Sequence, residues 1–229
     1  MSPRSNVSSH YYKTKLCVHN FCIYDMKSSE GYCFLWNETE GGLNSDEFAT
    51  IIATFFIETV IPKMGNNNRE IILFSDGCCY QNRNTVLANA LSNVAMLYNV
   101  TIIQKYLEVG HTQMEVDSMH AMIEKKLKNQ TINVPAEYIT VCQKAKKTKP
   151  YHVKYLTHTY FKSFKNLNFF RSIRPGKLKG DAKVSIYLTK TTNCTKPSSS
   201  SNYTYHTIVE VGRWVWGRTL CAFYLLIVL

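Results

Sequence analysis

Four acidic side chains in this sequence could hold a divalent cation. Asp76 directly follows a short apolar run, residues 71–74, and Glu115, Asp117 and Glu124 lie further along the chain. Mg²⁺ and Mn²⁺ prefer carboxylate oxygens as ligands, and clustered carboxylates suit metal-assisted phosphodiester chemistry. The residue types therefore predict a metal site built from Asp76, Asp117 and Glu124, with Glu115 as an alternative ligand.

Two histidines accompany these carboxylates. His111 precedes Glu115, and His120 lies between Asp117 and Glu124. Either histidine could transfer a proton or contact a scissile phosphate. A second kind of site is a mononuclear zinc centre of His111, Asp117, His120 and Glu124. The chain lacks the His-Glu-x-x-His arrangement of many zinc enzymes, so this pattern is less specific.

The surrounding elements predict a βαβα unit that would position these residues. The apolar run at 71–74 and a β-branched run at 101–107 are typical strands, and a helical pattern at about 85–98 connects them. A further helix begins near Asp117 or Ser118. Because the carboxyl ends of parallel strands lie at one edge of a sheet, the unit would bring the acidic residues together there.

The helix that begins near Asp117 has two faces. Asp117, His120 and Glu124 fall within about 60° of one another around the helix axis. An adjacent apolar face can pack on a sheet: Met119, Met122, Ile123 and Leu127. In a purely structural alternative, Asp117 caps the helix, His120 lies on the surface and Glu124 pairs with Lys128.

Further elements complete an α/β pattern. Residues 15–24 and 32–36 predict a hairpin. A helix begins at Asn44, which can cap it together with Glu47, and ends at Pro62. The other predicted elements are a helix over 135–147 and a strand over 184–188.

Positive charge is concentrated in one segment. The chain carries 27 Lys and Arg against 16 Asp and Glu, and residues 142–190 hold 13 of these cations beside Asp181 alone. Such a segment attracts phosphate backbones, and its interleaved aromatic rings could stack on bases. The cations assigned to nucleic-acid binding, within residues 144–183, are Lys144, Lys146, Lys147, Lys149, Lys154, Lys162, Lys165, Arg171, Arg174, Lys177 and Lys179. The open alternatives are a solvated basic surface and half-buried strand residues.

The cysteines and the two ends of the sequence bear on location. Eight cysteines include no Cys-x-x-Cys pair, so neither a zinc ribbon nor a redox motif is predicted. No secretory signal is visible at residues 1–13, which predicts reduced thiols, a nuclear or cytoplasmic protein and no secreted partner. Residues 219–229 are apolar, but they are about half of the ~20 residues that a membrane helix needs, so a tail anchor is the less favoured interpretation.

Two motifs carry a resemblance. Ser75-Asp76-Gly77 leads to Gln81-Asn82, and Gly110-His111-Thr112 leads to Glu115 and Asp117. These motifs resemble an RNase H-like domain of transposon-derived proteins, over roughly residues 12–186, with supporting matches at 36–38 and 172–176.

The resemblance implies the fold of RNase H, retroviral integrases and DDE transposases, a five-stranded mixed sheet flanked by helices. By that comparison Asp76 would be the second catalytic carboxylate, and Asp117, Glu115 or Glu124 the third. The family also places an Asp on a first, central strand, ahead of the segment that residues 11–13 resemble. Asp25 lies in a hairpin turn and is a poor substitute. The expectation is an N-terminally truncated copy with weak or absent nuclease activity.

The expected organisation and function follow. Residues 1–13 are frayed, 14–190 form the RNase H-like domain with a basic aromatic part at 142–190, 191–212 are a linker and 213–229 an apolar tail. The expected function is a degenerate transposase- or integrase-like domain with DNA as partner and Mg²⁺ or Mn²⁺ as cofactor. The alternative is a non-catalytic DNA- or RNA-binding protein that uses residues 144–183.

Overall fold

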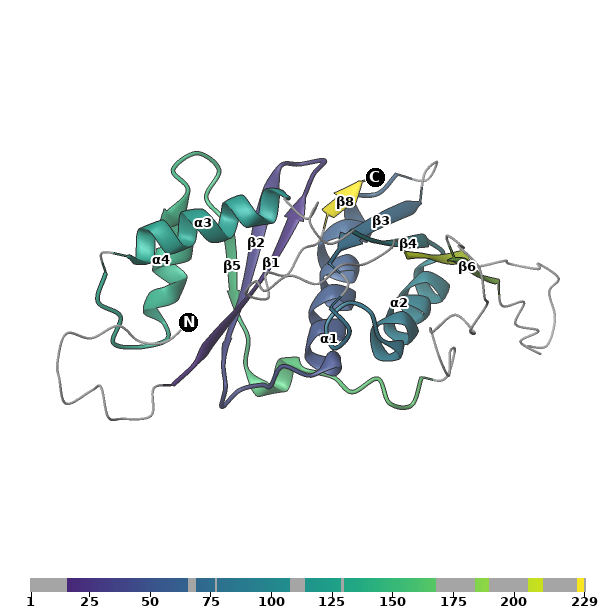
Figure 1. Cartoon of the computed structure of the whole chain (residues 1–229), viewed down its shortest axis with the longest axis horizontal. Coiled ribbons are helices and arrows are strands. Elements are labelled where there is room, and N and C mark those ends of the chain that lie inside the picture. Colours follow the sequence, from purple (N-terminus) through teal and green to yellow (C-terminus); the bar gives the residue numbers. More distant parts are fainter. Residues whose placement is uncertain are drawn as a thin grey trace.

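The chain folds around one mixed sheet with helices on both faces (Figure 1). A computed structural model describes residues 16–65, 69–76, 78–107, 114–128 and 130–167, and the backbone of 184–189, 206–211 and 226–228. The α/β class with a mixed sheet flanked by helices, predicted from the sequence, is confirmed.

In the described part of the chain eight strands form the sheet, where the resemblance implied five. They are β1 (Val18–Asp25), β2 (Glu30–Asn37), β3 (Glu70–Ser75), β4 (Thr101–Tyr106), β5 (His152–Tyr155), β6 (Val184–Thr189), β7 (His206–Val211) and β8 (Leu226–Val228). Their order is β5-β2-β1-β8-β3-β4-β7-β6. The predicted hairpin is β1 and β2, which pair antiparallel over eight positions. The predicted βαβ unit contains β3 and β4, which pair in parallel over six positions.

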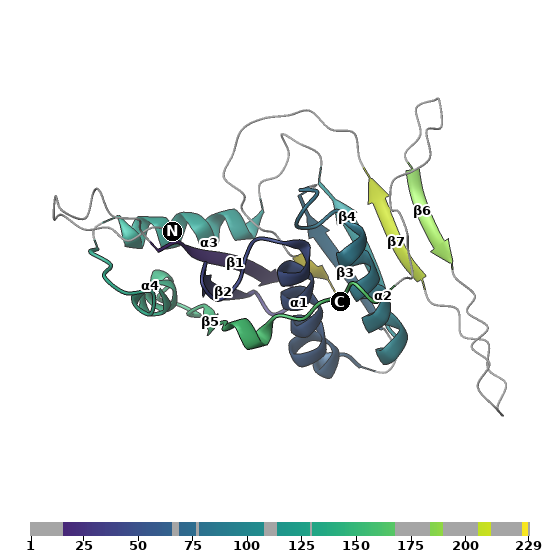
Figure 2. The ribbon, with the colours of Figure 1, turned by 90° about the horizontal axis from the view of Figure 1, so that it is seen from below.

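Strand β8 joins the two halves of the sheet (Figures 1 and 2). It runs parallel to β1, with Leu226 opposite Tyr24, and antiparallel to β3, with Leu226 opposite Phe74. The structure thus places a strand within the segment 213–229, which the sequence described as an apolar tail. Strand β7 lies within 191–212, where the sequence predicted a linker.

Two of the helices begin directly after the capping residues that the sequence indicated, Asn44 and Asn84. The described helices are α1 (Ser45–Phe55), α2 (Thr85–Tyr98), α3 (Glu115–Leu127) and α4 (Glu137–Ala145), with a short 3-10 turn η4 (His158–Tyr160). At α1, Glu47 accepts a hydrogen bond of 3.1 Å from the Asn44 backbone N–H. At α2, the Asn84 side chain accepts one of 2.8 Å from the Leu87 N–H. Within the described ranges, no helix has the length and apolarity needed to cross a membrane.

Helix α1 ends over two short turns of different geometry. A π-helical turn, η2 (Phe56–Val60), and a 3-10 turn, η3 (Ile61–Lys63), continue it. Pro62 lies in η3, and because proline lacks an N–H and clashes with the preceding turn, the α-helical pattern cannot continue through it.

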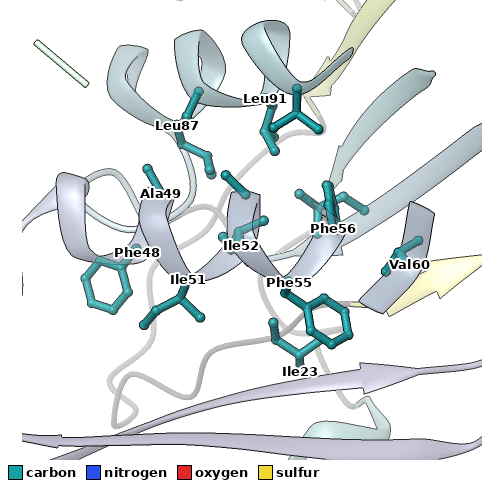
Figure 3. Close-up of a cluster of buried hydrophobic side chains, with 14 of the residues drawn as sticks. Ile23, Phe48, Ala49, Ile51, Ile52, Phe55, Phe56, Val60, Leu87 and Leu91 are labelled. Atoms are coloured by element: carbon teal, nitrogen blue, oxygen red, sulfur yellow. The ribbon is translucent and has the colours of Figure 1, made fainter. Parts of the chain in front are cut away.

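Two hydrophobic cores lie on opposite faces of the β1–β2 hairpin because successive strand residues point to opposite sides. The first core contains Phe21, Ile23, Phe34 and Trp36 together with the apolar faces of α1 and α2. Figure 3 shows Ile23 with side chains of both helices. The second contains Val18, Cys22, Cys33 and Leu35 together with α3 and α4. Helix α3 is therefore fixed on the face opposite α1.

Candidate functional site

Asp76 stands directly after β3, at the end of the strand where the sequence predicted a carboxylate. Its Oδ1 accepts a hydrogen bond of 2.6 Å from Asn82 Nδ2 and one of 3.3 Å from the Cys78 N–H. The parallel pairing of β3 with β4 places the ends of both strands at the same edge of the sheet. Asp76 is thus a positioned carboxylate, whereas Gly77 and His111 lie outside the described residues.

Burial and hydrogen bonds act in opposite directions on Asp76. Burial raises the pKa of its carboxyl because it disfavours the charged form, while the bonds from Asn82 and Cys78 lower it; the net shift is upward. A carboxylate with a raised pKa at the end of a strand is a common feature of functional sites.

Two buried amides accompany Asp76. Asn82 is 2% exposed, and its backbone carbonyl accepts a 2.9 Å hydrogen bond from the Tyr106 hydroxyl. Gln81 is fully buried, and neither its Nε2 nor its Oε1 has a hydrogen-bond partner in the described part of the chain. An unsatisfied buried amide is costly and calls for an explanation. Asn82 bonds the strand end, as the sequence indicated for these amides.

The acidic residues of α3 differ in role and exposure. Asp117 is the third residue of the helix, and its Oδ2 accepts a 2.9 Å bond from the Met114 N–H, so it has the capping role of the structural alternative. Glu115 and Glu124 are exposed. Among the described ion pairs, Glu124 forms none with Lys128, contrary to that alternative.

His120 is half-buried, where the structural alternative placed it on the surface. Its Nε2 is buried and has no hydrogen-bond partner within the described ranges. Burial opposes a charge on this ring, but the neighbouring Cys22, Asp117 and Glu124 favour one, and the net effect raises the pKa of His120. His120 is therefore a half-buried ring beside Cys22 of β1.

Three cysteines near His120 were not singled out by the sequence. Cys22 and Cys33 are opposite each other in β1 and β2, with their Sγ atoms 3.7 Å apart. Burial alone would raise the pKa of Cys22, but hydrogen bonding to Cys33 and the charge of His120 lower it to about 5. Hydrogen bonding to Cys142 and to Cys22, together with burial, raises the pKa of Cys33. The antiparallel register of the predicted hairpin could have placed Cys22 opposite Cys33. No local pattern in the sequence indicates that Cys142 lies near them.

The predicted carboxylate ligands do not form a three-ligand site in this structure. Across the described residues, no three His, Cys, Asp or Glu side chains are arranged around a point where a metal ion could bind. Asp76, Asp117 and Glu124 all belong to this described part. The metal site that they were expected to form stays a prediction.

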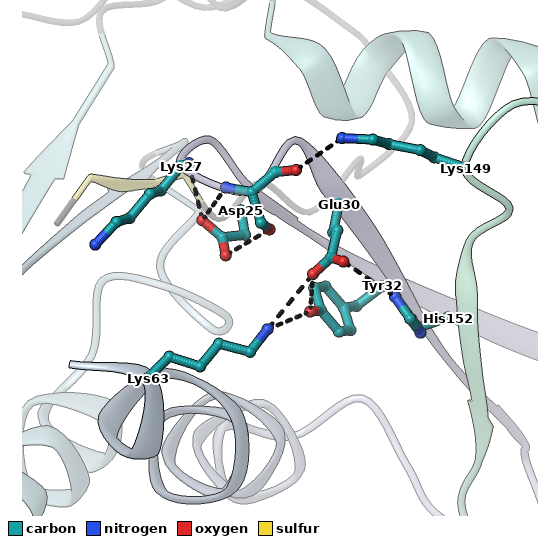
Figure 4. Close-up of polar contacts among 8 residues, drawn as sticks. Asp25, Lys27, Glu30, Tyr32, Lys63, Lys149 and His152 are labelled. Carbon is teal, nitrogen blue, oxygen red and sulfur yellow. Dashed lines mark hydrogen bonds and ion pairs between the residues drawn. The ribbon is translucent and has the colours of Figure 1, made fainter.

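Several of the basic residues bind other parts of the chain. Lys149 Nζ donates to the Ser28 carbonyl at 3.2 Å (Figure 4). Lys154 pairs with Glu58 at 3.1 Å and lies over the Tyr160 ring. Lys149 and Lys154 are themselves exposed, the other exposed lysines of the described segment are Lys144, Lys147, Lys162 and Lys165, and Lys146 is half-buried. Arg171, Arg174, Lys177 and Lys179 lie outside the described residues.

Aromatic rings of the basic segment pack against the domain. Residues 152–155 form β5, which confirms the strand alternative there. Tyr151 is 4% exposed, and Tyr160, Phe161 and Phe164 lie against the first core. These rings therefore contribute to the fold.

The turn of the β1–β2 hairpin carries a polar cluster (Figure 4). Asp25 accepts hydrogen bonds from the Lys27 N–H at 2.9 Å and the Ser28 hydroxyl at 2.8 Å, so its carboxylate closes the turn. Glu30 pairs with Lys63 at 3.4 Å and with His152 at 3.8 Å. This agrees with the expectation that Asp25 is a poor substitute for a catalytic carboxylate.

One small cavity lies beside this cluster. It measures about 160 Å³ and is lined by residues that include Tyr32, Phe55, Glu58, Lys154 and Tyr160. Pockets for small molecules usually measure roughly 300–1,000 Å³, and Glu58 and Lys154 already neutralise each other here. The Asp76 region is the stronger candidate site.

Comparison with known families gives one result. The profile of the family described as Domain of unknown function (DUF8701) matches residues 4–208. No curated protein and no solved structure matches the chain. Since the match covers most of the sequence, the chain belongs to the DUF8701 family.

Proposed function

We propose that this chain is a transposase- or integrase-like nucleic-acid-processing domain whose metal-assisted phosphodiester chemistry is degenerate. Asp76 supports the proposal because it stands at the end of β3, beside the parallel strand β4, and is held there by Asn82. Helix α3, which follows β4 in the chain, begins with Glu115 and Asp117. Carboxylates in these positions are the ones that the RNase H-like resemblance assigns to metal binding.

The arrangement of strands supports an RNase H-like relationship. An antiparallel hairpin, β1–β2, precedes a parallel pair, β3–β4, and helices cover both faces of the sheet. The resemblance expects a central strand with a catalytic Asp next to the Asp76 strand. The strand next to β3 here is β8, which runs antiparallel to it and consists of Leu226, Ile227 and Val228.

This apolar central strand is the observation that carries the proposal of a degenerate site. Two-metal catalysis places two cations roughly 3.5–4 Å apart, and a shared carboxylate is needed to offset their repulsion. None of the three β8 residues can supply one. A Mg²⁺ or Mn²⁺ ion would then have Asp76 and the α3 carboxylates as its available ligands, and we expect weak or absent strand cleavage.

A nuclease assay tests this proposal. The purified chain would be incubated with labelled single- and double-stranded DNA in Mg²⁺ or Mn²⁺, beside Asp76→Asn. Asp25→Asn serves as the matched control, because the Asp25 carboxylate closes a turn. We expect all three proteins to show the same negligible metal-dependent cleavage. Robust cleavage by the unmodified chain that Asp76→Asn abolishes and Asp25→Asn preserves would contradict degeneracy.

A second candidate function is non-catalytic binding of DNA or RNA through the basic segment. It is favoured by four exposed lysines, Lys144, Lys147, Lys162 and Lys165. Because binding to phosphates releases counterions, such binding weakens as salt rises. Binding of this kind needs no metal and would take place in the nucleus or the cytoplasm.

Charge substitutions separate the two functions. We expect Lys162→Ala with Lys165→Ala to weaken binding to any sequence and to reduce the slope of log K against log salt by about 1 for each phosphate that is no longer neutralised. The matched control is Lys125→Ala with Lys126→Ala, which removes two exposed cations from α3. Equally weakened binding in both double variants would indicate unspecific attraction, and unchanged binding in Asp76→Asn would favour the non-catalytic function.

A further inference from the structure

Two buried cysteines lie opposite each other on the face of the β1–β2 hairpin that forms the second core. Cys22 of β1 is in register with Cys33 of β2, both side chains are fully buried, and their Sγ atoms are 3.7 Å apart. The two cysteines are separated by 11 positions in the sequence, so no Cys-x-x-Cys motif marks them. Their contact is a product of the hairpin register.

The hydrogen-bond pattern of the hairpin places this pair where a disulfide can form. The Glu38 N–H donates to the Cys17 carbonyl at 3.0 Å, so these two residues are a hydrogen-bonded pair in the register of β1 and β2. Hydrogen-bonded and non-hydrogen-bonded pairs alternate along an antiparallel ladder, so Cys22 and Cys33, an odd number of positions further on, are a non-hydrogen-bonded pair. The Cα atoms of such a pair are about 4.5 Å apart, and disulfides span Cα separations of about 4.4–6.8 Å. The backbone therefore already has the geometry of a cross-strand disulfide.

The two sulfur atoms are already in contact. A disulfide bond is about 2.05 Å long, so each Sγ has to move by about 0.8 Å from the present separation of 3.7 Å. Because both sulfurs point into the same core from directly opposite positions, small changes in the two Cα–Cβ torsions bring them together.

The surroundings of the pair supply the nucleophile. Burial alone would raise the pKa of Cys22, but hydrogen bonding to Cys33 and the charge of His120 lower it to about 5. Hydrogen bonding to Cys142 and to Cys22, together with burial, raises the pKa of Cys33. At neutral pH the pair is thus a thiolate beside a thiol, and the thiolate is the form that reacts with oxidants and disulfides.

We propose that Cys22 and Cys33 are a redox pair that hydrogen peroxide converts reversibly into a cross-strand disulfide. The Cys22 thiolate attacks one peroxide oxygen and the O–O bond breaks; with one proton from solvent, the products are a sulfenic acid at Cys22 and water. The Cys33 sulfur then displaces the hydroxyl group, which leaves as a second water with the Cys33 proton as the S–S bond forms. The two thiols lose two electrons, and the peroxide accepts them.

Burial determines when the pair can react. Helices α3 and α4 pack over both thiols in the second core, and covered cysteines are inert. Peroxide therefore reaches the pair when these helices open locally from the hairpin. In a reducing compartment such disulfides are usually transient and sense oxidants, so the pair would record oxidation of a partly opened chain. The proposal does not depend on the proposed function, because neither thiol belongs to the Asp76 region.

Peptide mapping of the full chain tests the pair. The protein would be exposed to hydrogen peroxide for increasing times, with and without urea below the unfolding transition, then alkylated and separated on a non-reducing gel. Trypsin cuts the monomer band into peptide 16–27, which contains Cys17 and Cys22, and peptide 28–63, which contains Cys33. We expect these two peptides to be joined in most chains, to join faster in urea, and to be released by dithiothreitol.

One variant and a matched control locate the bond. Cys22→Ser should abolish the link, whereas Cys17→Ser, which removes the other thiol of the same peptide, should retain it. If Cys22→Ser fails to fold, fragmentation of the linked peptides from the unmodified chain identifies the joined cysteine. A link that persists in Cys22→Ser, peptide 28–63 joined instead to peptide 129–144 with Cys142, no link after prolonged oxidation, or a rate that urea leaves unchanged would overturn the proposal.

Discussion

Removing the Asn82 side chain should destabilise the fold through Asp76. In the structure Asn82 is 2% exposed and donates a 2.6 Å hydrogen bond to Asp76 Oδ1. Hydrogen bonds to a charged group contribute about 1.5–3 kcal/mol, and those between neutral groups about 0.5–1.5 kcal/mol. We therefore expect Asn82→Ala to lower the free energy of unfolding at neutral pH by about 2 kcal/mol.

The charge of Asp76 determines how much of this lost stability comes from the hydrogen bond between Asn82 and Asp76. In an Asp76→Asn background the bond joins two neutral groups, so Asn82→Ala should cost about 1 kcal/mol. The coupling free energy between the two positions is then about 1 kcal/mol. Asn89→Ala is the matched control, because Asn89 is 6% exposed and donates a 2.8 Å bond to the Leu167 carbonyl, a neutral acceptor.

The raised pKa of Asp76 also predicts how the free energy of unfolding changes with pH. The folded-state pKa of Asp76 is raised by burial, so its contribution to stability is fully present below the unfolded value of about 3.9 and is lost as the pH rises through the folded value. The bond from Asn82 lowers that pKa, so Asn82→Ala should raise it further. Asp76→Asn should remove this part of the pH dependence.

Urea unfolding of the four proteins of the cycle, and of the control, measures these free energies between about pH 4 and 7. Carbon-detected NMR of the Asp76 carboxyl gives its pKa directly. Two results would contradict a hydrogen bond from Asn82 to a charged Asp76. One is that the losses of stability from the two substitutions are additive within about 0.3–0.5 kcal/mol, and the other is that Asn82→Ala lowers the pKa of Asp76.

Three further predictions concern the framework. Phe48→Ala removes a fully buried ring from the first core and should cost about 3–5 kcal/mol in chemical unfolding, and a loss below about 1 kcal/mol would refute that packing. Asn84→Ala removes the cap that binds the Leu87 N–H and should cost about 0.5–2 kcal/mol, with Asn84→Gly much closer to the unmodified chain. Ile227→Pro removes a backbone donor from β8 and should lower the amide-exchange protection of β1 and β3 while β2 pairing persists; unchanged protection would contradict the position of β8.

Capping residues, turn residues and apolar patterns predicted the helices and strands whose formation depends on nearby residues. Helix α2 begins after Asn84 and ends before Asn99, which takes the left-handed conformation that ends helices (φ 51°). Helix α3 begins two residues earlier than expected, at Glu115, because Asp117 caps it from the third helical position rather than from the position before the helix. The hairpin and the parallel pair followed from apolar patterns and turn residues.

Interactions between distant segments were not visible in the sequence. Strand β8 belongs to an apolar segment whose composition predicts a tail, and only its pairing with β1 and β3 identifies it as an interior strand. Interior strands covered on both faces read as continuous apolar runs, so the composition was compatible with either interpretation. Helical periodicity predicts a polar stripe that contains His120 and Asp117, but it cannot show that Cys22 of β1 lies beside His120.

The position of β8 has a consequence for how the chain reaches its folded state. Leu226 pairs with Tyr24, so about two hundred residues separate the partners, and closing so long a loop is entropically unfavourable until other interactions have shortened it. The β1–β2 hairpin and the β3–α2–β4 unit can form early. The sheet between β1 and β3 can close only when residues 226–228 have paired with both strands. Until then two apolar strand edges face each other without their connecting strand, and association between chains during synthesis competes with correct closure.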